Sequence, residues 1–264
     1  MVFKSQMCPK RSNTNPGPFS ANLLVKMQRW GESQVRVRFF GDPNNMTIKE
    51  AERQLDRFLS EIVPVIGFRR IGSLEYASTI NEVTALLSFP TRLLARGGAS
   101  FTVWVGVRFE SLSKWLDDDA ATDMQSTIAR PIHLLREDRS YTEWEFSNSG
   151  DLETLRDTIS SDLKNYAVPF AERYSRIAEL RKTLESPNKQ DWISAGLNVD
   201  SRVTSLAAIR FVEGDKVGAI KTLEDGLKAL EESLADKSPE LRGRELRKRS
   251  FDMEYLRKRL LGNA

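Results

Sequence analysis

The spacing of hydrophobic positions changes along the chain. Apolar and polar residues alternate over residues 34–39, which predicts a strand because successive strand side chains point to opposite faces. Thr47 begins a Thr-x-x-Glu capping box, and the apolar residues after it are spaced as on one helix face as far as Ile62. Pro64 then predicts that this helix ends at residues 63–66.

Strand patterns follow between residues 68 and 146. The clearest spans residues 101–109, where five apolar residues alternate with Thr, Trp, Gly and Arg. The other expected strands are residues 68–76, 82–89, 132–135 and 142–146. The connections between them are short, which favours an antiparallel meander.

From Asp151 onward the apolar spacing is helical. Pro169 predicts a break in the first of these helices, and a second helix is expected to end before Pro187. Three amphipathic helices are expected after residue 190, the last opened by Pro239. Their apolar stripes need a covering surface, either the protein's own sheet domain or a second subunit.

These patterns predict an α+β fold: an antiparallel sheet of about four to six strands packed with helices, followed by a C-terminal helical hairpin or bundle. Turn-forming residues make residues 1–33 a flexible N-terminal arm. The α+β domain is then expected over residues 34–187 and the helical C-terminal region over residues 188–264. A length of 264 residues suits one large domain or two small ones.

Positive charge is concentrated at the two ends of the chain. Residues 1–40 hold seven basic and one acidic residue, and residues 237–264 hold nine basic and four acidic. The body, residues 41–236, holds 24 basic and 32 acidic residues, which leaves a net charge of +3. A basic end attracts nucleic acid or an acidic partner through its field. A solvated helix face rich in Lys and Arg is the simpler explanation, since acidic residues are interspersed.

Few residues are available for catalysis or metal binding. The chain has one cysteine, Cys8, and one histidine, His133, so a four-ligand Cys/His zinc site and an intramolecular disulfide are excluded. Phosphate-binding glycine loops and nucleophile elbows are absent from the sequence. The aspartates of residues 117–123 do not have EF-hand spacing, and Glu143 and Glu145 are expected to be solvated on one strand face. We expect no cofactor and no catalytic set.

Basic and aromatic residues supply the candidates for a binding surface. Trp104 and Arg108 share a strand face, and a basic-aromatic face can bind single-stranded nucleic acid. In the alternative arrangement, Trp104 lies under helices and Arg108 extends to solvent at an edge. The candidate residues are Arg36, Arg38, Arg69, Arg70, Trp104, Arg108, Arg247, Lys248 and Arg249.

Several aromatic and glycine-containing motifs lie between residues 53 and 185, about half of the chain. They are Gly67-Phe68-Arg69-Arg70-Ile71-Gly72, Tyr76, Phe101-Thr102-Val103-Trp104-Val105-Gly106-Val107, Trp144 and Pro169-Phe170. In this order they resemble a bacterial family known as domain of unknown function 4304. The resemblance implies no established activity.

A second, shorter resemblance lies at residues 200–235. The segment from Gly214-Asp215 to Leu223 is similar to the second helix of a tetratricopeptide hairpin. One copy is visible, whereas a stable solenoid needs about three. An ordinary helical hairpin explains the same pattern, and helical hairpins of either kind commonly bind protein.

The sequence favours a non-catalytic cytoplasmic protein that binds a macromolecule. A protein is the expected partner, and self-association through the C-terminal helices is a further option. A role in bacterial immunity or defence is one form of this function that the sequence neither supports nor excludes. The alternatives are a nucleic-acid-binding module that uses the basic termini and the sheet arginines, or an enzyme of unknown class. No apolar segment is long enough to span a membrane, so no membrane partner is expected.

Overall fold

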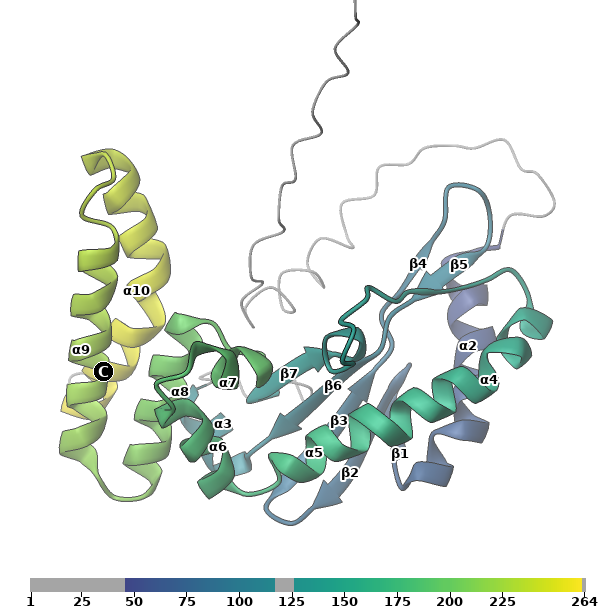
Figure 1. The fold of residues 1–264 in the computed structure, drawn as a ribbon, viewed down its shortest axis with the longest axis horizontal. Coiled ribbons are helices and arrows are strands. Elements are labelled where there is room, and N and C mark those ends of the chain that lie inside the picture. Colours follow the sequence, from purple (N-terminus) through teal and green to yellow (C-terminus); the bar gives the residue numbers. More distant parts are fainter. Residues whose placement is uncertain (1–45, 117–125, 263–264) are drawn as a thin grey trace, which may run out of the picture.

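The computed structural model describes residues 46–116 and 126–262, and it confirms the α+β fold class. An antiparallel sheet of five strands and another of three strands are packed with helices, and further helices follow toward the C-terminus (Figure 1). The N-terminal arm predicted at residues 1–33 and the strand predicted at residues 34–39 lie outside the described residues.

Helix α2 (Ile48–Ile62) begins and ends where the sequence predicts. The hydroxyl of Thr47 accepts the backbone N–H of Glu50 at 3.2 Å, which caps the helix. A short 3₁₀ turn, η1 (Pro64–Ile66), and Gly67 in the left-handed conformation follow. The buried face of α2 consists of Ala51, Leu55, Phe58, Leu59 and Ile62.

The larger sheet has the strand order β1-β2-β3-β6-β7. Its strands are β1 (Arg69–Gly72), β2 (Glu75–Ile80), β3 (Val83–Ser88), β6 (Trp104–Arg108) and β7 (Ile128–Pro131). The single strand predicted over residues 68–76 is a hairpin of two strands, because Leu74 adopts a φ of 58° and the chain reverses there. The strand predicted over residues 82–89 is confirmed as β3.

The smaller sheet consists of β4 (Thr91–Leu93), β5 (Ala99–Phe101) and β8 (Trp144–Phe146), in the order β4-β5-β8. The alternating segment 101–109 is therefore shared by two sheets, since β5 ends at Phe101 and β6 starts at Trp104. The five apolar residues of its alternating pattern are all buried nonetheless. β8 is the strand expected near residues 142–146, whereas the pattern does not predict β4.

The strand predicted at residues 132–135 is wrong. Pro131 is the last residue of β7 and pairs with Trp104, the first residue of β6. Beyond this point β6 offers no further partner, and Ile132–Leu134 form a 3₁₀ turn, η2, closed by a 3.0 Å bond from the Leu135 N–H to the Ile132 carbonyl. His133 therefore lies on a turn, where it is buried with its ring 5.0 Å from that of Tyr141.

The helix break predicted at Pro169 does not occur. Helix α4 (Ser149–Asp162), a π-helical turn η3 (Leu163–Ala167) and α5 (Val168–Arg173) form one curved helical segment along the larger sheet (Figure 1). The Val168 N–H bonds to the carbonyl of Leu163, five residues earlier. Because of this wide turn, Pro169 lies in the first turn of α5. A proline is tolerated there because the N–H that it lacks is not required for a helical hydrogen bond.

Only one face of the larger sheet belongs to the main hydrophobic core. Tyr76, Leu87 and Val105 are neighbours across β2, β3 and β6, and they are buried together with residues of α2, α4 and α5. Trp104 and Arg108 point to the opposite face, because they are one position out of phase with Val105. Trp104 therefore does not lie beneath α2, α4 and α5, the helices that cover the core face of the sheet.

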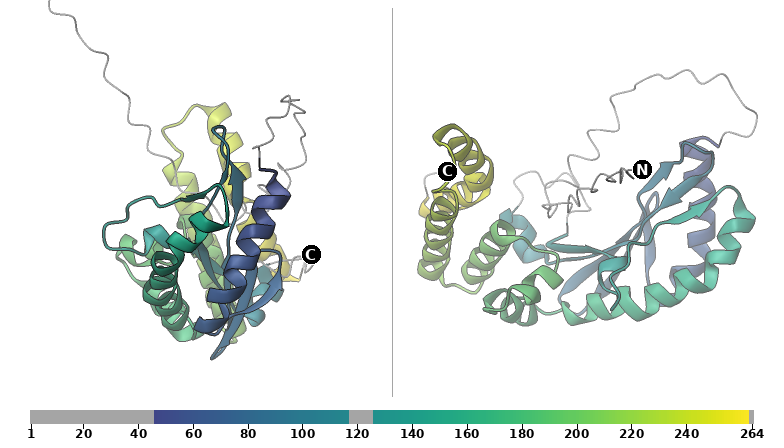
Figure 2. Two further views of the ribbon diagram at one scale, coloured as in Figure 1. Left: turned by 90° about the vertical axis from the view of Figure 1, so that its right-hand side faces the viewer. Right: turned by 45° about the horizontal axis from the view of Figure 1, so that its top comes forward.

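The C-terminal helices continue from this core. They are α6 (Ile177–Glu185), α7 (Lys189–Ser194), α8 (Val199–Val212), α9 (Lys216–Ser233) and α10 (Pro239–Leu261). Figure 2 shows the last of them beside one end of the sheet, away from α2 and α4.

Helix α8 is buried on two sides. Leu206 and Ile209 belong to the core of the sheet, whereas Val203 and Ala207 belong to a second core shared with α9 and α10. The expected boundary between residues 187 and 188 therefore falls inside continuous packing. The apolar stripes of the last helices are covered within the chain, so they require no second subunit.

Two glycines with the same backbone conformation test how the α7–α8 turn is packed. Gly196 and Gly214 both have a φ of 88°, but a Cβ on Gly196 would lie 2.1 Å from the Ala129 carbonyl oxygen of β7, whereas a Cβ on Gly214 would meet no atom within 4 Å. Both G196A and G214A incur left-handed strain of about 1–2 kcal/mol. We expect G196A to lose about 1–3 kcal/mol more in urea unfolding, because it adds the clash with β7. Equal losses would contradict this packing.

Candidate binding surface on the C-terminal helix

The structure does not bring the predicted sheet residues into one surface. Arg69 is exposed on edge strand β1, and strands β2 and β3 separate it from the half-buried Trp104. Arg70 forms an ion pair with Asp56 of α2 at 2.8 Å, and Arg108 pairs with Glu110 of α3 (Glu110–Leu116). Two of these arginines are therefore engaged within the protein. The candidates Arg36 and Arg38, like the aspartates of residues 117–123, lie outside the described residues.

Glu143 and Glu145 hold the smaller sheet together. Arg92 donates two hydrogen bonds of 2.6 Å to Glu143, which also accepts bonds from the hydroxyls of Ser100 and Tyr141. The bonds from Arg92, followed by those from Ser100 and Tyr141, lower the pKa of Glu143 to about 2 even though burial opposes the shift. Glu145 pairs with Arg96. Each carboxylate is thus bound to an arginine, which supports a structural role rather than acid–base catalysis.

The surroundings of His133 keep its ring neutral. Burial lowers the pKa of His133, and the nearby charges of Arg136 and Arg130 lower it further. Arg136 is itself paired with the buried Asp162 and lies 5.8 Å from the centroid of the Trp144 ring. Among the described residues, no three His, Cys, Asp or Glu side chains converge to hold a metal ion.

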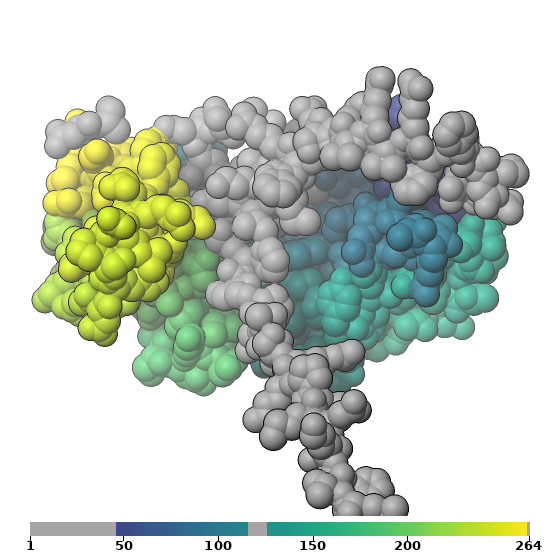
Figure 3. Space-filling view, turned by 90° about the horizontal axis from the view of Figure 1, so that it is seen from above, coloured from purple at the N-terminus to yellow at the C-terminus, as the bar shows by residue number. Residues whose placement is uncertain are grey.

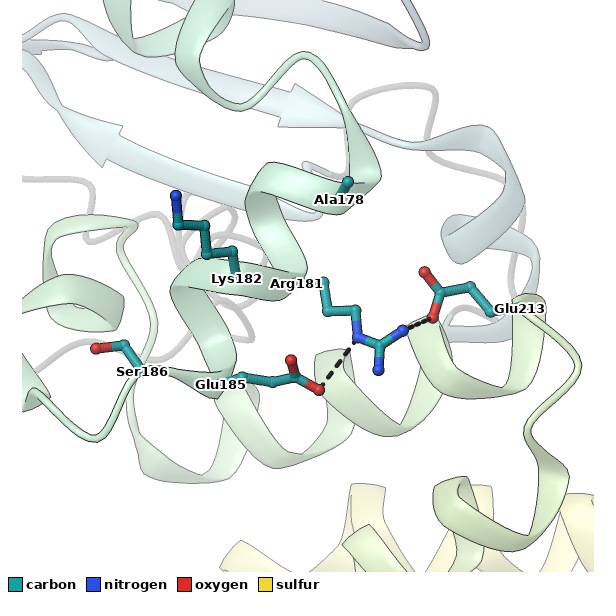
Figure 4. A pocket seen from close by; sticks show the side chains of 6 residues that line it. All are labelled: Ala178, Arg181, Lys182, Glu185, Ser186 and Glu213. Carbon is teal, nitrogen blue, oxygen red and sulfur yellow. Dashed lines mark hydrogen bonds and ion pairs between the residues drawn. The ribbon is translucent and has the colours of Figure 1, made fainter.

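An open cavity of about 370 Å³ lies where α6 meets the end of α8 (Figure 4). At its centre Arg181 bridges two carboxylates, with bonds of 3.1 Å to Glu185 and 2.5 Å to Glu213. The residues that line it are Ala178, Arg181, Lys182, Glu185, Ser186 and Glu213. The two ion pairs of Arg181 connect α6 to the end of α8. They support a structural role for this arginine rather than ligand binding.

The remaining candidates lie on α10, which has two different faces. Its inner face packs into the second core through Met253, Leu256 and Leu260. The basic residues beside this face are paired: Arg249 donates bonds of 2.8 and 2.9 Å to Asp200 of α8, and Arg257 lies 3.3 Å from Glu224 of α9. Arg249 is therefore an anchor of the helix rather than a free contact.

The solvent-facing side of α10 combines positive charge with an aromatic side chain. Its members follow the helical repeat, at intervals of three, four and seven residues, so they share one face. Phe251 is 68% exposed on this face, and the half-buried Tyr255 follows one turn later. We call this surface the α10 outer face, and it consists of Arg244, Arg247, Lys248, Phe251 and Lys258.

The cations of the α10 outer face are exposed, and none forms an ion pair within the described ranges 46–116 and 126–262. From Arg244 to Lys258 the stripe is about 21 Å long, at 1.5 Å per residue. Figure 3 shows the C-terminal helices, in yellow, forming one end of the molecule.

Contacts with α3 and α8 fix the position of α10. Arg259 lies 4.8 Å from the centroid of the Trp115 ring and donates to the carbonyls of Lys114 and Trp115, at the end of α3. Trp115 in turn contacts Phe211 of α8, with 3.9 Å between ring centroids. The outer face is therefore presented by a helix that is anchored to the body of the protein.

Sequence reasoning identified Arg247 and Lys248 but missed Arg244, Phe251 and Lys258. The signal was present in the helical spacing, because these residues lie opposite the apolar stripe of Leu256 and Leu260. Their exposure depends on which side of α10 the other helices cover, which only the tertiary structure shows.

Searches for similar proteins returned no matching family model, curated protein or solved structure. The resemblance to the domain of unknown function 4304 family and the tetratricopeptide-like hairpin therefore stay predictions. Across the helices of the described residues, none is both long and apolar enough to span a membrane.

The Arg92–Glu143 pair predicts a pH dependence of stability. In the folded protein Glu143 has a pKa of about 2, below the value of about 4.3 for a free glutamate. The pair therefore stabilises the fold fully above the unfolded pKa, and this contribution is lost as the pH falls through the folded pKa. In urea unfolding, the stability difference between wild type and E143Q should be largest at pH 7 and shrink toward pH 2.

The matched control is E145Q, because the Glu145 side chain is 47% accessible whereas that of Glu143 is 12% accessible. It should change stability little at any pH, since exposed ion pairs are screened by water. A wild-type minus E143Q difference that does not vary with pH would show that the charge of Glu143 does not matter.

Proposed function

We propose that this protein acts by binding another protein through its C-terminal helices, with the α10 outer face as the contact surface. The observation that carries the proposal is Phe251, an exposed aromatic side chain one turn from Arg247 and Lys248 on an anchored helix. Aromatic and arginine side chains contribute most of the binding energy in protein interfaces, and an apolar centre with a polar rim is their usual arrangement.

This surface replaces the one suggested by the leucine stripes. Leu223, Leu256 and Leu260 are buried in the second core, so they are unavailable to a partner. Their role is to hold α9 and α10 together and so to orient the outer face. The tetratricopeptide-like hairpin at residues 200–235 supports the same function, because helical hairpins commonly present protein-binding surfaces.

We place this activity in the cytoplasm, since a chain with one cysteine suits a reducing compartment. A role in bacterial immunity or defence is compatible with a protein that acts by binding. Nucleic-acid binding is the second candidate function, favoured by the exposed cations of α10. It predicts an affinity that falls steeply with salt as counterions are released.

Capture experiments with single variants test the protein-binding proposal. The tagged full-length protein is incubated with nuclease-treated host lysate, and bound proteins are quantified by mass spectrometry. Wild type should enrich a defined partner, and F251A should reduce its recovery at least tenfold, because truncating an interface hot spot costs about 2 kcal/mol or more. F251A should unfold at the wild-type temperature, since Phe251 contributes little to the core.

The control variant is V217A. Val217 is 80% exposed at the start of α9, so it matches Phe251 in exposure but lies outside the outer face. V217A should capture the partner as wild type does. Equal recovery by wild type and F251A would overturn the proposal. Nucleic acid captured from a parallel untreated lysate, with no protein captured from the nuclease-treated one, would favour the nucleic-acid alternative.

A further inference from the structure

We propose that the α10 outer face binds an acidic segment of the partner protein, and that an apolar side chain of this segment packs on Phe251. This inference rests on the proposed protein-binding function and adds the chemistry of the partner. It is drawn from the distribution of paired and unpaired charges around α10.

Whether a cation of α10 forms an ion pair depends on the side of the helix on which it lies. Arg249 and Arg257 point toward α8 and α9, and both are paired with carboxylates there. The four cations of the outer face point to solvent and have no such partner among the described residues. No ion pair joins these cations to a carboxylate of residues 46–116 or 126–262, so their charge is available to the carboxylates of a partner, and complementary charges are the usual means of orienting a protein partner.

The neighbouring helix argues for a protein rather than a nucleic acid. Helix α9 packs against α10 and carries four carboxylates and three lysines, a net charge of −1, against eight basic and four acidic residues in α10. The body of the chain, residues 41–236, has eight more acidic than basic residues. Nucleic-acid surfaces need extended positive potential, whereas the cations of the outer face form one stripe about 21 Å long beside a helix of net charge −1. A short acidic segment can follow the stripe alone.

A membrane surface fits the outer face poorly. Interfacial helices insert a continuous apolar face between lipids, with their basic residues on the other side. The apolar face of α10 is buried against α8 and α9, and its exposed apolar residues, Leu241, Phe251 and Leu261, are too far apart along the helix to form a continuous face for insertion. One exposed ring between cations suits a single apolar side chain of a folded partner or peptide.

The two kinds of contact have separable roles. The cations act at a distance and speed encounter with an acidic partner, so their effect weakens as salt rises. The ring of Phe251 acts only at contact and slows dissociation by keeping water away from the centre. The ionic contribution can therefore be removed by mutation without removing the aromatic one.

Charge reversal tests the inference in the full-length protein. R247E/K248E should reduce capture of the partner from nuclease-treated lysate at least tenfold at 50 mM salt, whereas R247K/K248R should retain it. The matched control is K164E/K189E, which reverses two exposed lysines on η3 and α7 and should capture as wild type does. Circular dichroism and thermal unfolding verify that all variants fold alike.

Zero-length carbodiimide cross-linking then identifies the contacting groups, because it joins amines only to adjacent carboxylates. Wild type should form cross-links from Lys248 and Lys258 to Asp or Glu residues of the captured protein. K248R/K258R keeps both charges and should retain capture while losing these cross-links. Cross-links to a second copy of this chain would instead identify self-association and overturn the inference.

The outcomes separate the inference from the function on which it rests. Capture that is lost in F251A but retained in R247E/K248E would leave protein binding in place and overturn the acidic partner. Capture that is unchanged in both variants would overturn both proposals. Nucleic acid captured by wild type from untreated lysate and lost in R247E/K248E, with no protein captured from nuclease-treated lysate, would overturn both in favour of the nucleic-acid alternative.

Discussion

The double burial of helix α8 is the constraint on which the arrangement of this protein depends. One side of α8 completes the core beneath the larger sheet through Leu206 and Ile209. The other side supplies Val203 and Ala207 to the core shared with α9 and α10. A helix that is apolar on both sides cannot lie at the surface, because burying its apolar area is the main favourable contribution to folding. The last two helices are therefore held to the body of the protein, although they are remote from the sheet.

The arginines of the protein fall into two groups with different physical roles. Those on or near the sheets, such as Arg70 and Arg92, meet carboxylates from another element and connect α2 to β1 or β4 to β8. Those of the α10 outer face meet solvent. These pairs orient strands and helices, and the Arg92–Glu143 pair also contributes to stability because the Glu143 side chain is largely buried. The second group keeps its charge available for another molecule, which is the physical basis for locating function at the C-terminal helix.

Exposure of Phe251 and burial of the leucine stripe are two consequences of one packing arrangement. The helix buries the side that carries Met253, Leu256 and Leu260, and this rotation directs Phe251 outward. Arg259 reinforces the rotation through its contacts with Trp115 and the end of α3. The outer face is thus set by packing elsewhere in the molecule, and a partner meets it in a prearranged form, which lowers the entropy cost of binding.

The sequence by itself determined the fold class and most of the elements, because local periodicity and capping act within a few residues. Helix α2 with its Thr47 cap and strand β3 follow directly from their own sequences. The hairpin at Leu74 and the continuous helix through Pro169 do not, because a left-handed residue and a π turn leave no apolar pattern.

Only the tertiary structure decided how the alternating segment 101–109 is divided between two sheets and which helix faces remain exposed to solvent. The segment 101–109 has one alternating pattern, yet its two halves pair with different strands, and pairing partners lie far away in the sequence. Tertiary contacts also decide which basic residues are paired. The sequence shows that the C-terminal end is basic, but whether a given Lys or Arg is neutralised depends on which carboxylates lie within a few ångströms of it. Arg249 is thereby an internal anchor and Arg247, two residues earlier, part of an exposed surface, because residues two apart on a helix point to nearly opposite sides, about 200° apart.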